Sequence, residues 1–150
     1  IHSDFDSIET FSKQVLLSFS KHAPKDKKII IKHHPMDRGR ADYSKFIISL
    51  SDKLKITDRV KVVHDVHLPT LLKNAIGTIT INSTVGLSSL YHETPVICLG
   101  RAMYDIEGLT AKDVDLDGFW SLDLQVNRDL YKKFRAYLVK NTQVNMSFYI

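Results

Sequence analysis

Two short polar motifs contain the residues best suited to chemistry. The first is Lys32-His33-His34-Pro35, which follows the apolar run Ile29-Ile30-Ile31 and is expected at the carboxyl end of a buried strand. Because Pro35 restricts the backbone before it, His34 is expected in an extended conformation. A histidine titrates near neutral pH, so His34 is our candidate for a general acid or for stabilising a leaving phosphate. The alternative is a loop histidine that only caps a neighbouring backbone group.

The second motif is Asn82-Ser83-Thr84-Val85-Gly86, where a predicted strand leads directly into a predicted helix. The first turn of a helix offers unpaired N–H groups, and the Ser83 and Thr84 hydroxyls add donors, so this motif predicts an anion site. Gly86 would let the backbone approach a ligand closely. The alternative is an ordinary helix N-cap, a role that Ser and Thr fill equally well.

Further candidates follow these motifs along the chain. Arg38 can reach a phosphate, although a solvated loop charge explains it equally well. Tyr104 and Glu107 follow the last predicted strand, where the base or ribose of a nucleotide lies in such sheets. The histidines at 64, 67 and 92 lack a diagnostic spacing, so no metal site is predicted. The complete set of predicted ligand contacts is His34, Pro35, Arg38, Asn82, Ser83, Thr84, Gly86, Tyr104 and Glu107.

The elements that must position these motifs alternate between helix and strand. Apolar periodicity predicts helices starting at 6–9 and ending at 21–23, then at 43–54, 69–74, 85–92 and 128–139, and strands at 28–32, 60–63, 78–81 and 95–99. Alternation with short links predicts an α/β fold, a Rossmann-like parallel sheet with helices on both faces. Ligands bind beyond the carboxyl ends of such strands, where both motifs lie.

Composition and charge narrow the class of protein. The 150 residues, 43% hydrophobic and 25% charged, predict a single soluble domain, residues 1–150. Twelve Lys or Arg and five Asp lie at 21–61, a net charge of +7, whereas two basic and six acidic residues lie at 101–125, a net of −4. A basic segment suits nucleic acid, anionic lipid or a phosphate-bearing ligand. The chain contains no nucleic-acid-binding motif, Walker loop or dinucleotide fingerprint, which favours a phosphate-bearing small molecule.

The motifs resemble the bacterial capsule polysaccharide synthesis family of the KpsS/LipB type. The resemblance covers about the last 120 residues, with its segments in the family's order. Met146 stands where the family usually has glycine. Because the chain starts with isoleucine in place of methionine, we also expect it to be a piece of a longer protein. The matching segments are 32–39, 82–87, 95–96, 99–100, 104–106, 108–110, 142–145 and 147–149.

The resemblance implies a GT-B glycosyltransferase with two Rossmann-like domains, of which this chain would be the C-terminal, donor-binding one. The enzyme would use CMP-Kdo to build a β-Kdo linker on a phosphatidylglycerol-type lipid, without a cofactor, at the cytoplasmic face of the inner membrane. It would work with the capsule assembly and export complex. His34 would contact the CMP phosphate, and Ser83 and Thr84 would hold it.

The same resemblance implies that this chain alone is inactive, because the acidic nucleophile would lie in the absent N-terminal domain. Two other functions are kept open. One is a different CMP- or UDP-sugar enzyme of the same architecture, and the other is a non-catalytic scaffold of the capsule biosynthesis and export machinery.

Overall fold

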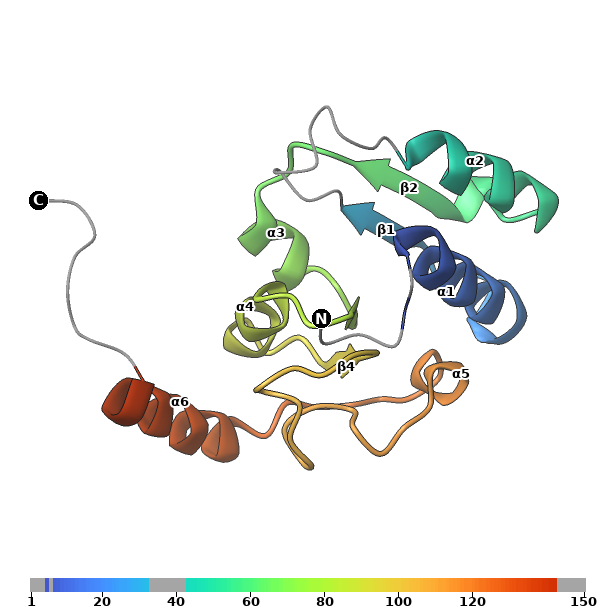
Figure 1. Ribbon diagram of the computed structural model, residues 1–150. Coiled ribbons are helices and arrows are strands. Elements are labelled where there is room, and N and C mark those ends of the chain that lie inside the picture. The colour runs from blue at the N-terminus through green and yellow to red at the C-terminus, as the bar shows by residue number, and fades with distance from the viewer. Residues whose placement is uncertain (1–4, 6, 33–42, 143–150) are drawn as a thin grey trace, which may run out of the picture. The chain divides into compact units, whose positions relative to one another are not determined.

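The computed structural model describes residues 5, 7–32 and 43–142, in which helices alternate with short parallel strands (Figure 1). This mixed α/β arrangement is consistent with a Rossmann-like fold and confirms the predicted class. By its internal contacts the chain divides into two compact units, residues 1–71 with 114–123 and residues 72–113 with 124–150. The elements are α1 (Ile8–His22), β1 (Ile29–Lys32), α2 (Ser44–Lys53), η2 (Thr57–Arg59), β2 (Val60–Val63), α3 (Leu68–Lys73), β3 (Thr78–Thr80), α4 (Val85–Tyr91), β4 (Val96–Cys98), α5 (Leu116–Phe119) and α6 (Arg128–Thr142).

Helix α1 begins and ends where the sequence predicts. The Ser7 hydroxyl accepts a hydrogen bond from the Thr10 N–H at 3.1 Å, which satisfies one of the free donors of the first turn. At the other end Ala23 is extended, as expected before Pro24, and its N–H still donates to the Phe19 carbonyl. The N-cap bond and the extended Ala23 thus set the two ends of α1.

In the first unit, β1 and β2 pair in parallel, with Ile29 opposite Val60. Helix α2 connects them, and α1 packs beside α2 (Figure 1). Ile29 and Ile31 of β1 and Val60 and Val62 of β2 pack against this core, whereas Ile30 is 45% exposed, so the expectation of a fully buried strand is corrected. The buried centre of this core is formed by Leu16, Phe19, Ala23, Ile47 and Ile56.

In the second unit, β3 and β4 pair in parallel, with Thr78 opposite Val96. Helix α4 connects these strands, and α6 contributes Phe134 to the core. The described strands thus form two pairs, with one crossover helix in each pair. The buried centre of the second core is formed by Leu90, Val96, Tyr104, Leu109 and Phe134.

Two short elements were not predicted. Helix η2 has three residues and α5 has four, too few for a periodic apolar pattern to be visible. Gly118 lies within α5, where its N–H donates to the carboxylate of the N-cap Asp115 at 2.7 Å. Gly108 lies in a turn of the loop after β4, with a φ of 76° that favours glycine. Among the described helices, none has the length and apolar character of a membrane-spanning segment.

Candidate functional site

Apart from Lys32, the first predicted motif lies outside the described residues. His34, Pro35 and Arg38 belong to the segment 33–42, so their roles stay predictions. The structure does show that β1 ends at Lys32, which places this motif directly after the carboxyl end of a strand.

The second motif forms a compact turn between β3 and α4, and we refer to residues 82–84 as the Ser83 turn. The Ser83 N–H donates to the Thr80 hydroxyl at 3.2 Å, and the Ser83 hydroxyl accepts from the Val85 N–H at 3.2 Å. Ser83 is half-buried, whereas Asn82 and Thr84 are exposed. The three polar side chains therefore lie at the carboxyl end of β3, as the sequence predicts.

The N–H groups of this turn are less available than expected. The Val85 N–H is engaged by the Ser83 hydroxyl, and the Gly86 N–H donates to the Ser83 carbonyl at 3.0 Å. Thr84 occupies the N-cap position but makes no side-chain capping bond. The side chains of the turn add donors that the engaged N–H groups of Val85 and Gly86 do not supply. The Ser83 hydroxyl keeps its own proton for donation, and the Thr84 hydroxyl and Asn82 amide add further donors.

Tyr104 supports this turn from the loop after β4. Its side chain is 2% exposed, and its hydroxyl donates to the Ser83 carbonyl. A Cβ atom on Gly86 would overlap the Tyr104 hydroxyl oxygen, far inside van der Waals contact. The space on the Cβ side of Gly86 is thus filled by Tyr104, and a ligand contact at the Gly86 backbone stays a prediction.

Burial also sets the protonation of the groups around Tyr104. Loss of solvation, with a smaller contribution from Cys98, raises the pKa of the Tyr104 phenol. Burial, assisted by the negative charge of Asp105, raises the pKa of the Cys98 thiol to about 11. Both groups are neutral at physiological pH, so Tyr104 keeps its proton for Ser83.

Glu107 lies in the same loop as Tyr104 and is exposed. The Thr110 hydroxyl closes the loop by donating to the Asp105 carboxylate at 2.6 Å. A contact of Tyr104 or Glu107 with a nucleotide stays a prediction. Within residues 7–32 and 43–142, no group of three His, Cys, Asp or Glu side chains is arranged to hold a metal ion.

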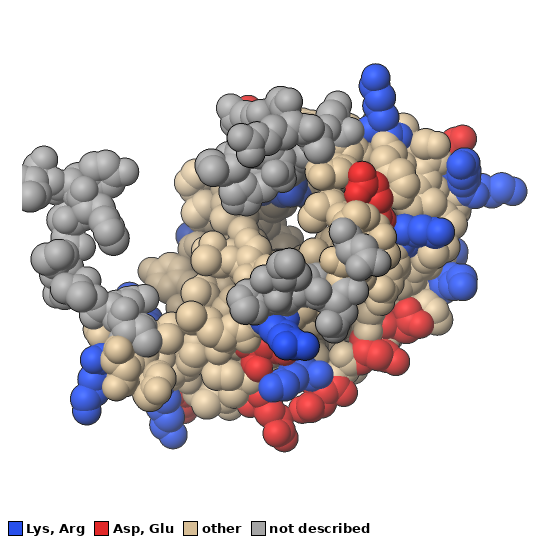
Figure 2. Space-filling view, in the orientation of Figure 1, with Lys and Arg blue, Asp and Glu red and all other residues tan. Residues whose placement is uncertain are grey.

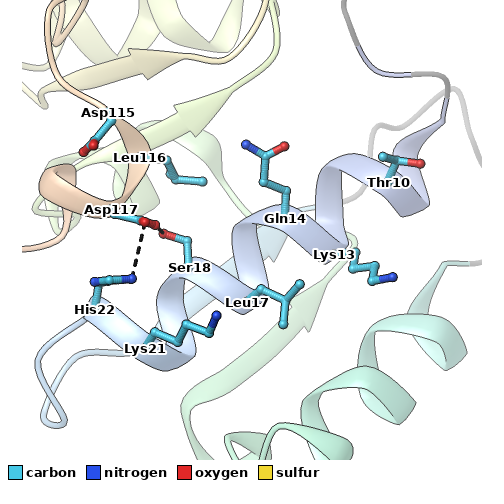
Figure 3. A pocket seen from close by; sticks show the side chains of 10 residues that line it. All are labelled: Thr10, Lys13, Gln14, Leu17, Ser18, Lys21, His22, Asp115, Leu116 and Asp117. Carbon is cyan, nitrogen blue, oxygen red and sulfur yellow. Dashed lines mark hydrogen bonds and ion pairs between the residues drawn. The ribbon is translucent and has the colours of Figure 1, made fainter.

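A pocket beside α1 and α5 in the first unit has no counterpart among the sequence predictions (Figure 3). The pocket has a volume of about 480 Å³ and carries charges of both signs, so charge alone does not select an anion. Basic side chains gather over α1 and α2 and acidic ones near α5 on the face shown in Figure 2. The pocket is lined by Thr10, Lys13, Gln14, Leu17, Ser18, Lys21, His22, Asp115, Leu116 and Asp117.

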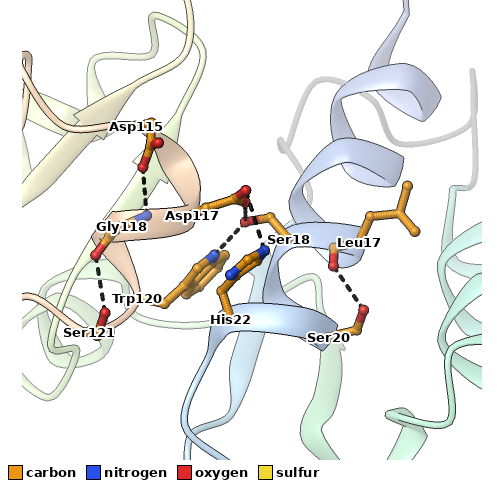
Figure 4. Close-up of polar contacts among 9 residues, drawn as sticks. All are labelled: Leu17, Ser18, Ser20, His22, Asp115, Asp117, Gly118, Trp120 and Ser121. Atoms are coloured by element: carbon orange, nitrogen blue, oxygen red, sulfur yellow. Dashed lines mark hydrogen bonds and ion pairs between the residues drawn. The ribbon is translucent and has the colours of Figure 1, made fainter.

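A polar network forms one side of this pocket (Figure 4). The buried Ser18 hydroxyl donates to Asp117 at 2.5 Å and accepts from the Trp120 indole N–H at 2.7 Å. The other Asp117 oxygen lies 3.3 Å from His22 Nε2. Asp117 is thus held by α1, which indicates a structural role. The only trace of this network in the sequence is a serine on the apolar face of α1.

Comparison with known proteins gives matches along the whole chain. Residues 1–149 match the family model described as capsule polysaccharide biosynthesis protein. The chain is 43% identical over 148 residues to the capsule polysaccharide export protein KpsS of Escherichia coli, an alignment covering 99% of this chain and 38% of that protein. It is 47% identical over 150 residues to the capsule polysaccharide modification protein LipB of Neisseria meningitidis serogroups A and B, covering 99% of this chain and 36% of those proteins. No solved structure matches the chain.

Proposed function

The chain belongs to the capsule polysaccharide biosynthesis family, and from this premise we propose that it is the donor-binding domain of a bacterial capsule glycosyltransferase. In this proposal the full-length protein is a β-Kdo transferase of the GT-B type. It uses CMP-Kdo to build a β-Kdo linker on a phosphatidylglycerol-type lipid acceptor. The comparisons support a role in capsule polysaccharide synthesis, and the transferase activity, the donor and the acceptor are the proposed part.

The observation that carries the donor site is the Ser83 turn. It presents the amide of Asn82 and the hydroxyls of Ser83 and Thr84 at the carboxyl end of β3 in a Rossmann-like fold. Ligands of such folds bind beyond the carboxyl ends of the strands. Neutral donors with free protons suit a phosphate, whose oxygens are hydrogen-bond acceptors.

In the proposed reaction, negative charge develops on the CMP phosphate beside this turn. When the bond between the Kdo anomeric carbon and the phosphate oxygen breaks, the electron pair stays with CMP and negative charge grows on its phosphate. The Ser83 and Thr84 hydroxyls donate to that charge, and His34, when protonated, neutralises part of it. Loss of one well-placed donor of this kind typically costs about 3 kcal/mol of transition-state stabilisation.

The proposal requires partners outside this chain. The chain spans 36–38% of the relatives' length. We assign the nucleophile to a further, N-terminal domain of the full-length protein. The full-length protein would lie at the cytoplasmic face of the inner membrane with the capsule assembly and export complex. The basic segment 21–61 suits anionic lipid head groups there.

Transfer by the full-length protein tests the proposal. With CMP-Kdo and a phosphatidylglycerol acceptor, mass spectrometry of the lipid product should show Kdo addition. The double variant Ser83→Ala/Thr84→Val should transfer at least about 100-fold more slowly, since two phosphate donors are removed. The control Ser49→Ala, on the exposed face of α2, should transfer normally. Wild-type rates in the double variant would contradict the proposed donor site.

One relative's name favours a second function, because the Escherichia coli protein is called an export protein. A non-catalytic scaffold of the export machinery would keep the fold and lose the chemistry. His34→Ala in the full-length protein separates the two functions. Normal capsule in this variant would favour the scaffold, and loss of capsule with normal protein levels would favour the transferase.

A further inference from the structure

The hydrogen bond from Tyr104 to the Ser83 turn gives Tyr104 a role that needs no contact with a ligand. We propose that Tyr104 is a positioning residue, which fixes the Ser83 turn in the conformation that binds the donor phosphate. This inference rests on the proposed function of the turn. In this inference Tyr104 affects nucleotide binding through Ser83 and does not contact the nucleotide itself.

Tyr104 is a tertiary link to the Ser83 turn. The bonds from the Ser83 N–H to Thr80 and from Val85 to the Ser83 hydroxyl are local, formed within three residues of the chain. The Tyr104 hydroxyl comes from 21 residues away and donates to the Ser83 carbonyl. Local bonds shape the turn, whereas this bond fixes it to the body of the second unit.

Tyr104 is itself rigidly held. Its ring lies in the core with Leu90, Val96 and Leu109. Its own carbonyl accepts from the Ile106 N–H at 3.0 Å, which closes a tight turn after the ring. A buried ring on a closed turn has little freedom, so it can impose a position on the Ser83 carbonyl.

Gly86 completes the arrangement by leaving room for the ring. The methyl group of an alanine at this position would overlap Tyr104 Cζ as well as the hydroxyl oxygen. Either the ring or the first turn of α4 would have to move. In both cases the Tyr104 hydroxyl would lose its alignment with Ser83.

The test measures CMP affinity and thermal stability separately in the full-length protein. Tyr104→Phe keeps the ring and removes the hydroxyl, and we expect it to bind CMP about tenfold more weakly, as for loss of one aligned hydrogen bond. Calorimetry is done below the unfolding temperature, so a purely structural role would lower Tm and leave the Kd unchanged. Tyr137→Phe is the matched control, because Tyr137 is 63% exposed on α6.

A pair of variants tests the steric part. Gly86→Ala should weaken CMP binding at least as much as Tyr104→Phe. Adding Tyr104→Leu to Gly86→Ala removes the steric clash, but the double variant still lacks the Tyr104 hydroxyl. It should therefore be thermally more stable than Gly86→Ala without reaching the CMP affinity of the wild type. A double variant that binds CMP as tightly as the wild type would overturn a positioning role for the hydroxyl.

The outcomes separate this inference from the proposed function. If Tyr104→Phe binds CMP normally while Ser83→Ala/Thr84→Val binds it weakly, the positioning role is overturned and the donor site stands. If the wild-type protein does not bind CMP, both are overturned. Weaker binding by Tyr104→Phe with a normal Tyr137→Phe control supports both.

Discussion

Trp120 and Ser18 are joined by a hydrogen bond of 2.7 Å from the indole N–H to the serine hydroxyl, although 102 positions separate them in the sequence. The same hydroxyl donates to Asp117 at 2.5 Å. The Trp120 ring also packs edge-on against Phe19, with centroids 5.2 Å apart. One buried serine therefore attaches the segment that contains α5 to α1 within the first unit.

Ser18→Ala should lower the free energy of unfolding by about 2 kcal/mol, because it leaves the Trp120 indole and Asp117 without this partner. Urea unfolding followed by tryptophan fluorescence measures the change. Ser49→Ala in α2 is the control, since it makes the same helical substitution at an exposed position. Equal stability of the two variants would mean that the network contributes nothing.

Arg59 should be a second determinant of stability. It is 7% exposed, and its guanidinium donates to the Lys27 and Pro24 carbonyls at 2.9 and 2.6 Å and lies 4.3 Å from the Phe19 ring centre. Arg59→Met should cost about 3 kcal/mol, because it leaves these carbonyls unpaired. Lys61→Met, at an exposed position of β2, should change stability by less than about 0.5 kcal/mol. Similar urea midpoints for both variants would contradict this account.

Lys55 should be replaceable by glycine with a gain in stability. It follows α2 with a φ of 57°, and the next N–H, of Ile56, donates back to Ser51 at 2.9 Å, which is the Schellman arrangement. Glycine adopts this backbone without steric strain, so Lys55→Gly should raise the free energy of unfolding by about 0.5–1 kcal/mol. Lys53→Gly, inside the helix, should lower it by about 1 kcal/mol. A loss in both variants would argue against the cap.

The Cys98 thiol should react slowly below pH 9. Burial raises its pKa to about 11, so the reactive thiolate is scarce at pH 8 and increases about tenfold for each pH unit up to that value. Because the folded pKa exceeds the ordinary value of 9.0, the stabilisation from the neutral thiol is present below pH 9 and lost as the pH rises towards 11. Iodoacetamide labelling of the folded protein between pH 7 and pH 10 measures this. A labelling rate that levels off near pH 9 would contradict it.

The alternation of helices and strands was predictable because each element has a visible local pattern. The run Ile29 to Ile31 indicates a strand, although Ile30 proves exposed, and Ser7 before an apolar periodicity indicates the start of α1. Helix α5 was not predicted, because four residues show no period and its Asp117 is bound by Ser18, far away in the sequence. Local sequence patterns thus predict the longer elements, whereas a short helix such as α5 depends on tertiary hydrogen bonds that the sequence does not show.

The Ser83 turn was predicted in position but not in detail. Its place after β3 follows from the sequence, whereas the reason for Gly86 does not. The sequence suggests room for a ligand, and the structure shows room for Tyr104, which lies 18 residues further along the chain. Such a steric pair becomes visible only when the fold brings the two residues together.

The central claim is that the Ser83 turn binds the phosphate of a cytidine nucleotide, and the most direct measurement is a titration of the ¹⁵N-labelled chain with CMP followed by NMR. We predict saturable shifts of the Ser83 and Thr84 amide signals, with the amide signals of α6 unaffected. Ser83→Ala/Thr84→Val should weaken binding without unfolding the chain. An unchanged spectrum at millimolar CMP, or equal shifts throughout the molecule, would contradict the account.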